Sequence, residues 1–502
     1  MKRRDFLTAA SASMLPVMLD GFSLKGMSRQ SALVQSLLQT SALSTDRVLV
    51  IVYLNGGNDG LNTVLPLDQL SVYNGLRSNI AIPQNRILAL DGNPTTGFHP
   101  AMSDMRSLYN AGKLTIVHSV SYPNPDLSHA RSTDIWMTGV DASQNATSGW
   151  AGRYLDNRFP DYPNSYPNGL MEDPLAIQIG YITSTALLGS QQSMAIALND
   201  PDNFYELVGI NDPVSPQEAL PGDVGALLSF IRKQQNLAVG YAEKIKTAAD
   251  AGKNLAVYPE PNAHNSLAEQ LKIVARLIHG GLKTKVYYVS MNGFDTHSAQ
   301  VDPTDTTMGE HASLLGKLSA ALASFQRDLE MQGTASRVIG MTFSEFGRRA
   351  NANASAGTDH GVAAPMFVFG TGVKHQTIGQ NPDLSNLTGF YGNKDIGMQI
   401  DFRRVYSDIL TNWFGVDSTT TASLLFREFP TVSLFSNTIE TIASGNWQDR
   451  SVWTIGRVPL ATEYVRINSG HTLTVDRSIT VKQIRLDGKL NFTGPYTIRM
   501  TG

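Results

Sequence analysis

Short apolar runs, each bounded by turn-forming residues, recur along most of the chain. Continuous runs of this length are typical of strands that are buried on both faces of a parallel sheet. Five such runs are predicted strands: Val48–Leu54, Leu114–Val120, Lys283–Ser290, Arg337–Phe343 and Met366–Gly370. We therefore expect one large sheet to hold most of the core.

Apolar residues at helical spacing separate several of these runs. One predicted helix begins at Ser266, which has capping-box spacing to Glu269, and ends before Gly280-Gly281. A second runs through Leu314–Leu322 and ends near Gly333, and a third spans Asp401–Phe414. Strands alternating with helices predict the α/β class, with a doubly wound, mostly parallel sheet over residues 46–440. Sites in such sheets form at the carboxyl ends of the strands.

The pattern changes near Asn446. Short alternating strands follow, separated by Gly, Asp and Ser turns: Val465–Ile467, His471–Val475, Ile479–Val481 and Ile484–Leu486. We interpret residues 447–502 as a small all-β module, with a few rungs of a β-solenoid as one arrangement. It carries no catalytic constellation, so its expected role is to adhere, anchor or cap.

The N-terminus has the anatomy of a secretory leader, with a charged start and a short apolar stretch over Thr8–Leu19. The stretch is too short for a membrane span, which needs about 20 apolar residues. Arg3-Arg4, followed by Phe6-Leu7, resembles the bacterial twin-arginine export signal. We predict a signal peptide over residues 1–22, a polar tether over 23–45, and a location in the periplasm, cell envelope or outside the cell. The alternative is an ordinary basic N-terminus on a cytosolic protein.

The composition of the chain limits its possible partners and metal ligands. A net charge of −3 argues against a nucleic-acid partner, which would favour a basic face. The chain has no cysteine, which excludes disulfides, thiolate nucleophiles, zinc–thiolate sites and iron–sulfur clusters. A metal must therefore be held by His, Asp, Glu or other oxygen ligands.

Two polar motifs lie in the first third of the chain. Leu54–Gly60 follows the first strand. Its glycines allow close approach of a ligand, and Asp59 could bind a metal. Asn, Gly and Asp are also the usual residues of a tight turn, which is the alternative interpretation of this motif. Ser128 is expected at a helix N-terminus, where free backbone N–H groups favour an anion. Beside Arg131 it could act as a nucleophile, or it could only cap the helix.

Further motifs follow the third and fourth predicted strands. Asp295 and His297 come directly after the third strand, and both suit a divalent ion; His311 could join them. Glu345 and Arg348 follow the fourth strand, and Asp359-His360 precedes the fifth. The arginine fork suits an oxyanion. Four motifs at successive strand ends favour a shared site over independent structural roles.

In this order, these motifs resemble the bacterial domain of unknown function 1501 family, over about residues 46–440. That family is similar in layout to the alkaline phosphatase and sulfatase superfamily. The resemblance implies a divalent metal (zinc, manganese or calcium). It also implies roles for particular residues: catalytic Ser128, His129 and Arg131; metal ligands Asp59, Asp295, His297, Glu345 and His360; and Arg348 at the oxyanion.

The chain departs from the superfamily at two positions. Asn55 stands where the first strand should end in a metal-binding Asp, and Phe346 where a histidine is expected. The leading hypothesis is a metal-assisted hydrolase of small-molecule or glycan phosphate or sulfate esters. The main alternative is a non-catalytic envelope protein, with a degraded site, that binds polysaccharide or a protein. An exported oxidoreductase ranks last, because no Gly-x-Gly-x-x-Gly follows the first strand.

Overall fold

The structure is a computed structural model that describes residues 17–19, 22–24 and 46–500, except for 165, 170, 209–221, 261–263, 375, 389–393, 436–437, 454–456 and 462. The chain divides into two compact units, residues 1–45 and 46–502. In the first, β1 (Val17–Leu19) pairs antiparallel with β2 (Phe22–Leu24). The twin-arginine motif and residues 25–45 of the predicted tether lie outside the described residues.

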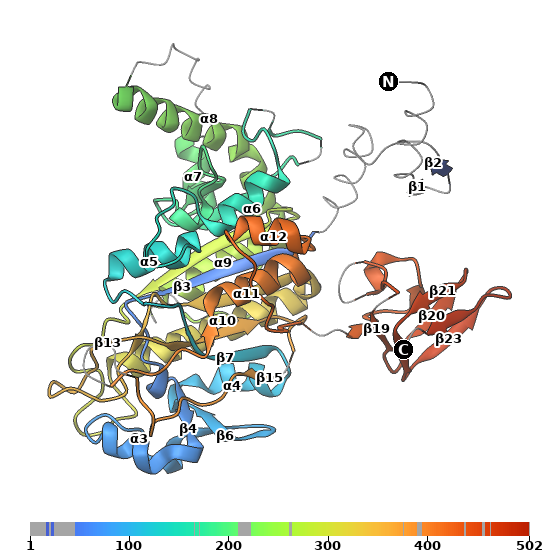
Figure 1. Ribbon diagram of the computed structural model, residues 1–502. Helices are drawn as coiled ribbons and strands as arrows, with labels where there is room; N and C mark the ends of the chain where they lie inside the picture. The colour runs from blue at the N-terminus through green and yellow to red at the C-terminus, as the bar shows by residue number, and fades with distance from the viewer. Residues whose placement is uncertain are drawn as a thin grey trace, which may run out of the picture. The chain divides into compact units, whose positions relative to one another are not determined.

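A nine-stranded sheet forms the centre of the second unit, in the order β15-β7-β14-β11-β3-β10-β8-β9, with β16 also on β7 (Figure 1). Its strands are β3 (Val48–Asn55), β7 (Leu114–Ser121), β8 (Ala176–Ile179), β9 (Ala195–Leu198), β10 (Val286–Asn292), β11 (Val338–Phe343), β14 (Ala364–Phe369), β15 (Gln376–Ile378) and β16 (Ile400–Asp401). β3 is central, paired parallel to β10 and to β11, and its residues from Val48 to Leu54 are buried. The predicted α/β class with a mostly parallel sheet is confirmed.

One predicted strand has an unexpected direction. β14 is antiparallel to both of its neighbours, β7 and β11, whereas the other pairings among the described strands of this sheet are parallel. The amino end of β14 therefore lies at the edge where β3, β7, β10 and β11 have their carboxyl ends. Residues that precede β14 reach that same edge.

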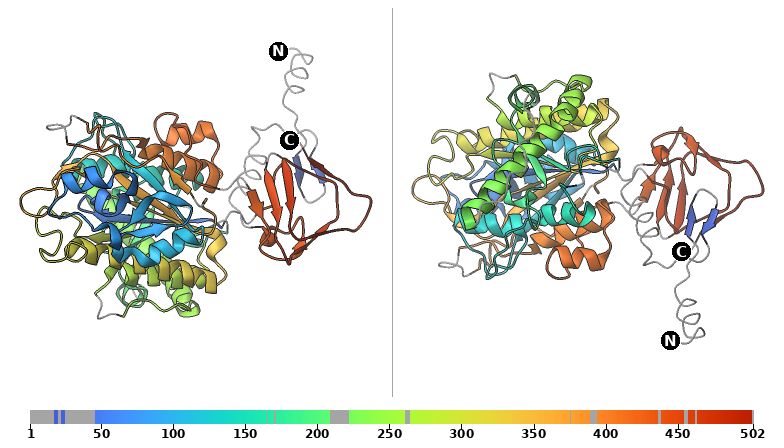
Figure 2. Two further views of the ribbon diagram at one scale, coloured as in Figure 1. Left: turned by 90° about the horizontal axis from the view of Figure 1, so that it is seen from below. Right: turned by 90° about the horizontal axis from the view of Figure 1, so that it is seen from above.

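Helices cover both faces of the sheet (Figure 2). On one face α9 (Ser266–His279) and α10 (Glu310–Met331) pack with α4 (Ser103–Asn110), and Met105 N donates to Ser319 Oγ at 2.9 Å. On the other, α11 (Phe402–Asp408) stacks on α5 (His129–Thr138) and α6 (Trp150–Arg158) through the Trp136–Phe402 and Trp150–Tyr406 ring pairs. The doubly wound arrangement is thus observed.

The helix ends differ in detail from the prediction. The N-cap of α9 is Asn265, whose side chain accepts from Ala268 N, and not Ser266. α11 continues as a π-helical turn over Ile409–Trp413. Outside the C-terminal strands, the remaining α-helices and strands of the described residues are α3 (Leu70–Leu76), α7 (Pro201–Val208), α8 (Gly222–Ala251), α12 (Ser418–Leu424), the small sheet of β4 (Val64–Pro66), β5 (Leu88–Leu90) and β6 (Asn93–Phe98), and the pair β12 (Gly347–Arg348) with β13 (His360–Gly361).

The C-terminal strands stack in parallel rungs. The stacks are β17 (Thr438–Glu440), β19 (Tyr464–Ile467) and β22 (Gln483–Leu486); β18 (Gly445–Asn446), β20 (Thr472–Val475) and β23 (Lys489–Phe492); and β21 (Ile479–Val481) with β24 (Ile498–Met500). Inward residues such as Val465, Leu473 and Val481 form a core of their own with Trp447 and Trp453. The pairing begins at β17, ahead of residue 447.

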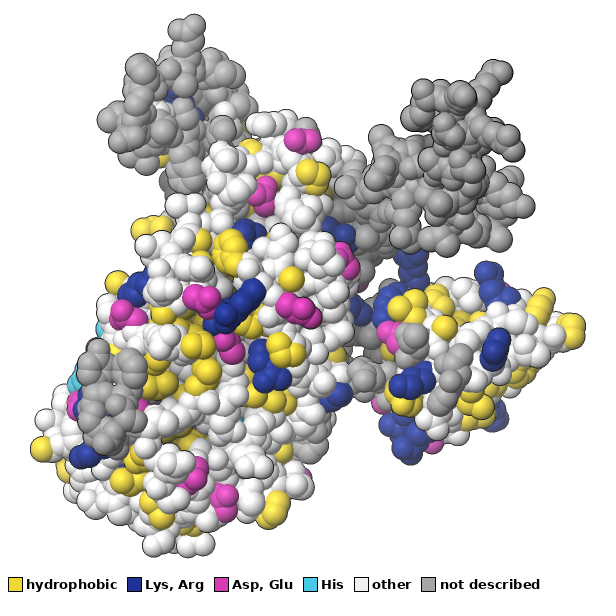
Figure 3. Space-filling view, viewed as in Figure 1, with side chains coloured by type: hydrophobic (Ala, Val, Ile, Leu, Met, Phe, Trp, Pro, Cys, Tyr) yellow, Lys and Arg dark blue, Asp and Glu magenta, His cyan; other side chains and the backbone are white. Residues whose placement is uncertain are grey.

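Among the described residues, no helix is both long enough and apolar enough to cross a membrane. On the face drawn in Figure 3, acidic and basic side chains are interspersed over the α/β part of the molecule. This distribution agrees with the small net charge.

Because the C-terminal strands have their own core, we expect them to unfold as a separate unit when that core is damaged. Leu473 is fully buried, so Leu473→Ala should cost about 2–5 kcal/mol. Calorimetry should show a separate low-temperature transition, with Trp447 and Trp453 fluorescence following it. Leu486→Ala, at a side chain 50% exposed in the same strands, is the matched control. If Leu473→Ala instead shows one cooperative transition at a lower temperature, the C-terminal strands do not unfold as a separate unit.

Candidate metal centre at the carboxyl edge of the sheet

Four segments bring polar side chains to one edge of the sheet. His129 is the first residue of α5, which follows β7, and Asp295 and His297 follow β10. Glu345 follows β11, and His360 lies in β13, just ahead of β14. The antiparallel direction of β14 is what places His360 at this edge instead of the opposite one. The predicted convergence of Asp295, His297, Glu345 and His360 is therefore seen in the structure.

His129, Asp295 and His360 each offer one ligand atom, and these three atoms lie within 4.8 Å of one another. His129 Nε2 is 3.5 Å from Asp295 Oδ2, and His360 Nε2 is 3.2 Å from Asp295 Oδ1. His297 Nε2 lies beside them, 3.1 Å from Asp295 Oδ1 and 2.9 Å from His360 Nε2. We call these four residues the ligand cluster. Their side chains are 22–46% exposed, so an ion and a substrate can reach them.

The opposite ring nitrogen of each histidine faces a protein oxygen. His360 Nδ1 is 2.8 Å from the carbonyl of Leu127, and His129 Nδ1 is 2.7 Å from Glu345 Oε1. A carbonyl oxygen can only accept, so the hydrogen of neutral His360 is on Nδ1 and its Nε2 lone pair points into the cluster. His297 Nδ1 lies 3.7 Å from Asp359 Oδ1, beyond hydrogen-bonding distance, so only His129 and His360 are held by such a bond. Metal-binding histidines in proteins are held in this way.

The charges also suit a cation. Burial alone would raise the pKa of Asp295, but the hydrogen bond and the positive charge of Arg348 outweigh it and lower that pKa to about 2. Burial lowers the pKa of His360. A metal binds the ionised carboxylate and the neutral imidazole, so both shifts favour the binding forms near neutral pH.

Glu345 supports the cluster instead of ligating in it. Its side chain is fully buried, and its carboxylate accepts from Gly56 N at 3.0 and 3.2 Å as well as facing His129 Nδ1. These contacts hold it behind the imidazole, on the side away from Asp295. Glu345, a predicted ligand, thus contacts His129 Nδ1 in the structure, and it is not among the three residues whose ligand atoms lie together.

Arg348 does not fit the predicted oxyanion role, because its side chain has no exposed surface. Nε donates to Gly57 O at 2.6 Å, Nη1 to Thr358 O at 2.7 Å, and Nη2 to Asp295 Oδ1 at 2.6 Å. Nη2 also bonds the carbonyls of Gly56 and Phe294. The guanidinium ties three loops together, so a substrate cannot reach it.

Asp59, another predicted ligand, lies apart from the ligand cluster. It is fully buried, and its Oδ2 pairs with Arg77 Nη1 at 2.5 Å. His311 is also buried, and its Nε2 contacts Asn58 Oδ1 at 3.0 Å. Neither belongs to the group of side chains that could share an ion with His129.

The two departures from the superfamily pattern have structural roles. Asn55 donates to Asn292 Oδ1 at 3.0 Å and accepts from the Tyr53 hydroxyl at 3.1 Å. The Phe346 ring packs against the His360 and His129 rings, with centroids 4.3 and 4.9 Å apart. It cannot ligate, but it fixes the planes of two imidazoles that can.

The remaining predicted catalytic residues lie around the start of α5. Ser128 is the N-cap residue, as predicted, but its exposed hydroxyl makes no capping hydrogen bond. Its neighbours are Leu127, whose carbonyl faces His360, and His129. Arg131 is turned away from Ser128, to Asp134 and to the carbonyls of Ala142 and Gln144.

Residues 233–425 match a family model described as "Protein of unknown function (DUF1501)". The family predicted from the motifs is confirmed over this stretch. It contains Asp295, His297, Glu345, Arg348 and His360, whereas His129 and the first strand lie outside it. The DUF1501 match is thus shorter than residues 46–440.

The solved structures that are similar to this chain at low identity include the following three. A sulfatase from Pseudoalteromonas sp. is 10% identical, with a TM-score of 0.34, and the match covers 86% of this chain and 80% of that one. An alkaline phosphatase superfamily protein from Vibrio parahaemolyticus is 9% identical (TM-score 0.30; 70% and 72% covered). The alkaline phosphatase of the Antarctic bacterium TAB5 is 10% identical (TM-score 0.25; 65% and 92% covered). No curated protein matches the chain.

The support from Phe346 predicts a strong effect at Gly57. Gly57 has φ +78°, and a Cβ there would lie 2.3 Å from Phe346 Cε2, whereas Gly92 has φ +71° with open space around it. Gly92→Ala should cost about 1–2 kcal/mol for its backbone conformation alone. Gly57→Ala should cost about 1–3 kcal/mol more, because Phe346 must move. Urea denaturation measures both, and equal losses would contradict the packing described here.

Proposed function

We propose that this chain is an exported, metal-assisted hydrolase of phosphate or sulfate esters. One observation carries the proposal: three imidazoles whose outer nitrogens face protein oxygens direct their Nε2 atoms toward the carboxylate of Asp295. His129, Asp295 and His360 would hold the ion, and His297 could complete the set. A divalent ion held there stabilises negative charge on ester oxygens. The Arg3-Arg4 leader supports a location in the cell envelope or beyond.

Of zinc, manganese and calcium, the ligand atoms of this cluster favour zinc. Imidazole nitrogens with one carboxylate suit zinc, whereas calcium takes six to eight oxygen ligands. Manganese accepts the same residues but prefers more oxygen. The structure also favours one ion per chain, since Asp59, Asn55 and Phe346 are occupied elsewhere or cannot ligate.

Ser128 is the proposed nucleophile. It is exposed at the N-terminus of α5, between Leu127, whose carbonyl contacts His360, and His129. The backbone amides of the first turn of α5 have no partner within the helix. Attack would form a bond from Oγ to phosphorus or sulfur and break the bond to the ester oxygen. The hydroxyl proton ends on the departing alcohol, and water then cleaves the seryl ester to phosphate or sulfate. The free α5 amides suit the oxyanion that Arg131 and Arg348 cannot reach.

The metal assignment predicts about one zinc ion per chain after reconstitution. His129→Ala and Asp295→Ala should each weaken binding by more than about 100-fold, because each removes a ligand. Competition titration with a chromophoric chelator and elemental analysis give the affinity and the stoichiometry. His264→Gln and Asp302→Asn, outside the cluster, are matched controls that should bind as the wild type. Unchanged affinity in the ligand variants would rule out this centre.

The nucleophile assignment separates chemistry from metal binding. Ser128→Ala should keep the bound zinc and lower ester hydrolysis by about 10³-fold or more, since the group that attacks is gone. Nitrophenyl phosphate and sulfate esters serve as first substrates, and Ser103→Ala, at the exposed start of α4, is the control. Full activity in Ser128→Ala would exclude the seryl intermediate. Zinc-loaded wild type without activity on a broad ester panel would favour the envelope-binding alternative.

A further inference from the structure

A buried chain of hydrogen bonds adjoins the ligand cluster. Asp59 Oδ2 accepts from Arg77 Nη1 at 2.5 Å and from Gln300 Nε2 at 2.6 Å. Gln300 Oε1 in turn accepts from the hydroxyls of Thr296 and Thr358, each at 3.0 Å. All five side chains are at most 1% exposed. We call these five residues the Gln300 relay.

We propose that the Gln300 relay positions Asp295, His297 and His360. Thr296 stands between Asp295 and His297 in the sequence, and Thr358 precedes His360 by two residues. Each threonine hydroxyl fixes the backbone segment that carries a neighbouring ligand-cluster residue. Thr358 N also donates to Thr296 O at 3.2 Å, so the two segments are joined directly as well.

The orientation of Gln300 follows from chemistry. The Asp59 carboxylate accepts hydrogen bonds and has none to donate, so the amide nitrogen of Gln300 must face it. The amide oxygen then faces the two threonine hydroxyls, which both donate. Burial would raise the pKa of Asp59, but Arg77 outweighs it and holds that pKa below its usual value. Asp59 therefore remains an acceptor, and the direction of every bond in the relay is set.

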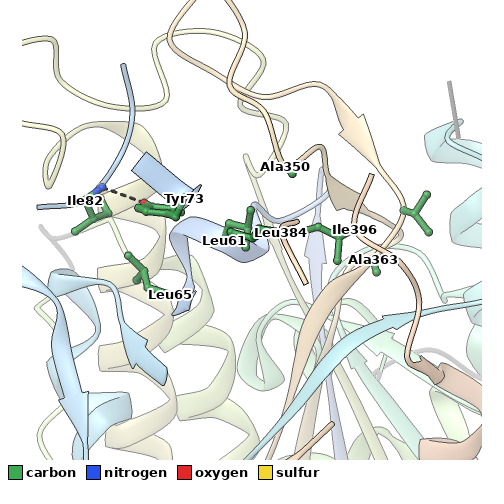
Figure 4. Close-up of a cluster of buried hydrophobic side chains, with 9 residues drawn as sticks. Leu61, Leu65, Tyr73, Ile82, Ala350, Ala363, Leu384 and Ile396 are labelled. Carbon is green, nitrogen blue, oxygen red and sulfur yellow. Dashed lines mark hydrogen bonds between the residues drawn. The ribbon is translucent and has the colours of Figure 1, made fainter. Parts of the chain in front are cut away.

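The base of the relay is held rigidly. Arg77 Nε and Nη2 donate to the carbonyls of Ala350 and Arg349, each at 2.8 Å. Arg77 Nη1 and the Tyr73 hydroxyl both donate to Asn62 Oδ1, at 3.0 and 2.8 Å. Tyr73 belongs to a cluster of buried apolar side chains, in which its hydroxyl also accepts from Ile82 N (Figure 4). The relay thus connects this packed core to the two segments that carry Asp295, His297 and His360.

The relay joins the same three segments that Arg348 ties together, and it does so through side chains that continue to the packed core. Asp59 follows β3, Thr296 and Gln300 follow β10, and Thr358 lies between β12 and β13. Loops that hold a site within a fraction of an ångström need such supporting contacts. The proposal rests on the proposed metal centre for its function, but the positioning itself can be tested without a metal.

The decisive variant is Thr358→Val, which keeps the side-chain shape and removes the hydroxyl donor. Thr358→Ser retains the donor and should restore what the valine variant loses. Thr284→Val is the matched control: Thr284 is also fully buried and donates one hydrogen bond, to Pro174 O at 2.8 Å. It precedes β10, at the opposite end of the strand from Asp295.

The first measurement uses metal-free protein with ¹³C-labelled histidine. We expect the His360 and His297 ring signals to shift or broaden in Thr358→Val, to return in Thr358→Ser, and to stay unchanged in Thr284→Val. Unchanged signals in Thr358→Val, in a protein that folds, would overturn the relay. If Thr358→Val does not fold, Thr296→Val and Thr296→Ser are compared in the same way.

The second measurement is zinc affinity, together with the visible spectrum of the cobalt-substituted protein. Loss of a positioning contact should weaken zinc binding by about 10-fold and alter the cobalt bands, with recovery in Thr358→Ser. Wild-type affinity and spectrum in Thr358→Val would contradict the proposal. If the wild type binds no metal while the histidine signals respond to Thr358→Val, the proposed centre fails and the relay stands.

Discussion

The arrangement of this edge of the sheet depends on one buried guanidinium. Arg348 has no exposed surface, and burying an arginine is costly unless its N–H groups find acceptors. It finds them on the carbonyls of Gly56, Gly57, Phe294 and Thr358 and on the carboxylate of Asp295. The loops that follow β3 and β10 and precede β13 must therefore converge on it. The same contact keeps Asp295 ionised and turned toward the histidines.

The direction and order of the strands bring these loops close to one another. β3, β10 and β11 are parallel neighbours, so their following loops begin side by side. The antiparallel β14 adds a fourth segment from its amino end, which no parallel strand could supply at this edge. Phe346 then packs against two imidazoles, His129 and His360, that come from distant parts of the chain. Topology brings the segments together, and buried side chains fix their final positions.

The sequence predicted the fold better than it predicted the site. Long apolar runs identify strands by themselves, and the five predicted strands begin within three residues of those observed. β8 and β9 have four residues each, too few to stand out as apolar runs. The direction of β14 depends on pairing between distant strands, which no local pattern encodes.

Site residues were harder to assign, because a polar residue after a strand can point outward or into the protein. His297 and Glu345 have equally suggestive positions in the sequence, yet one is half exposed and the other is buried. Burial separates the residues that meet a ligand from those that hold them. The buried set and Asp295 together bring three carboxylates (Asp59, Asp295 and Glu345) against two guanidinium groups (Arg77 and Arg348). One carboxylate is therefore in excess over the guanidinium groups beside the point where the Nε2 atoms meet, and such an excess of negative charge favours a cation.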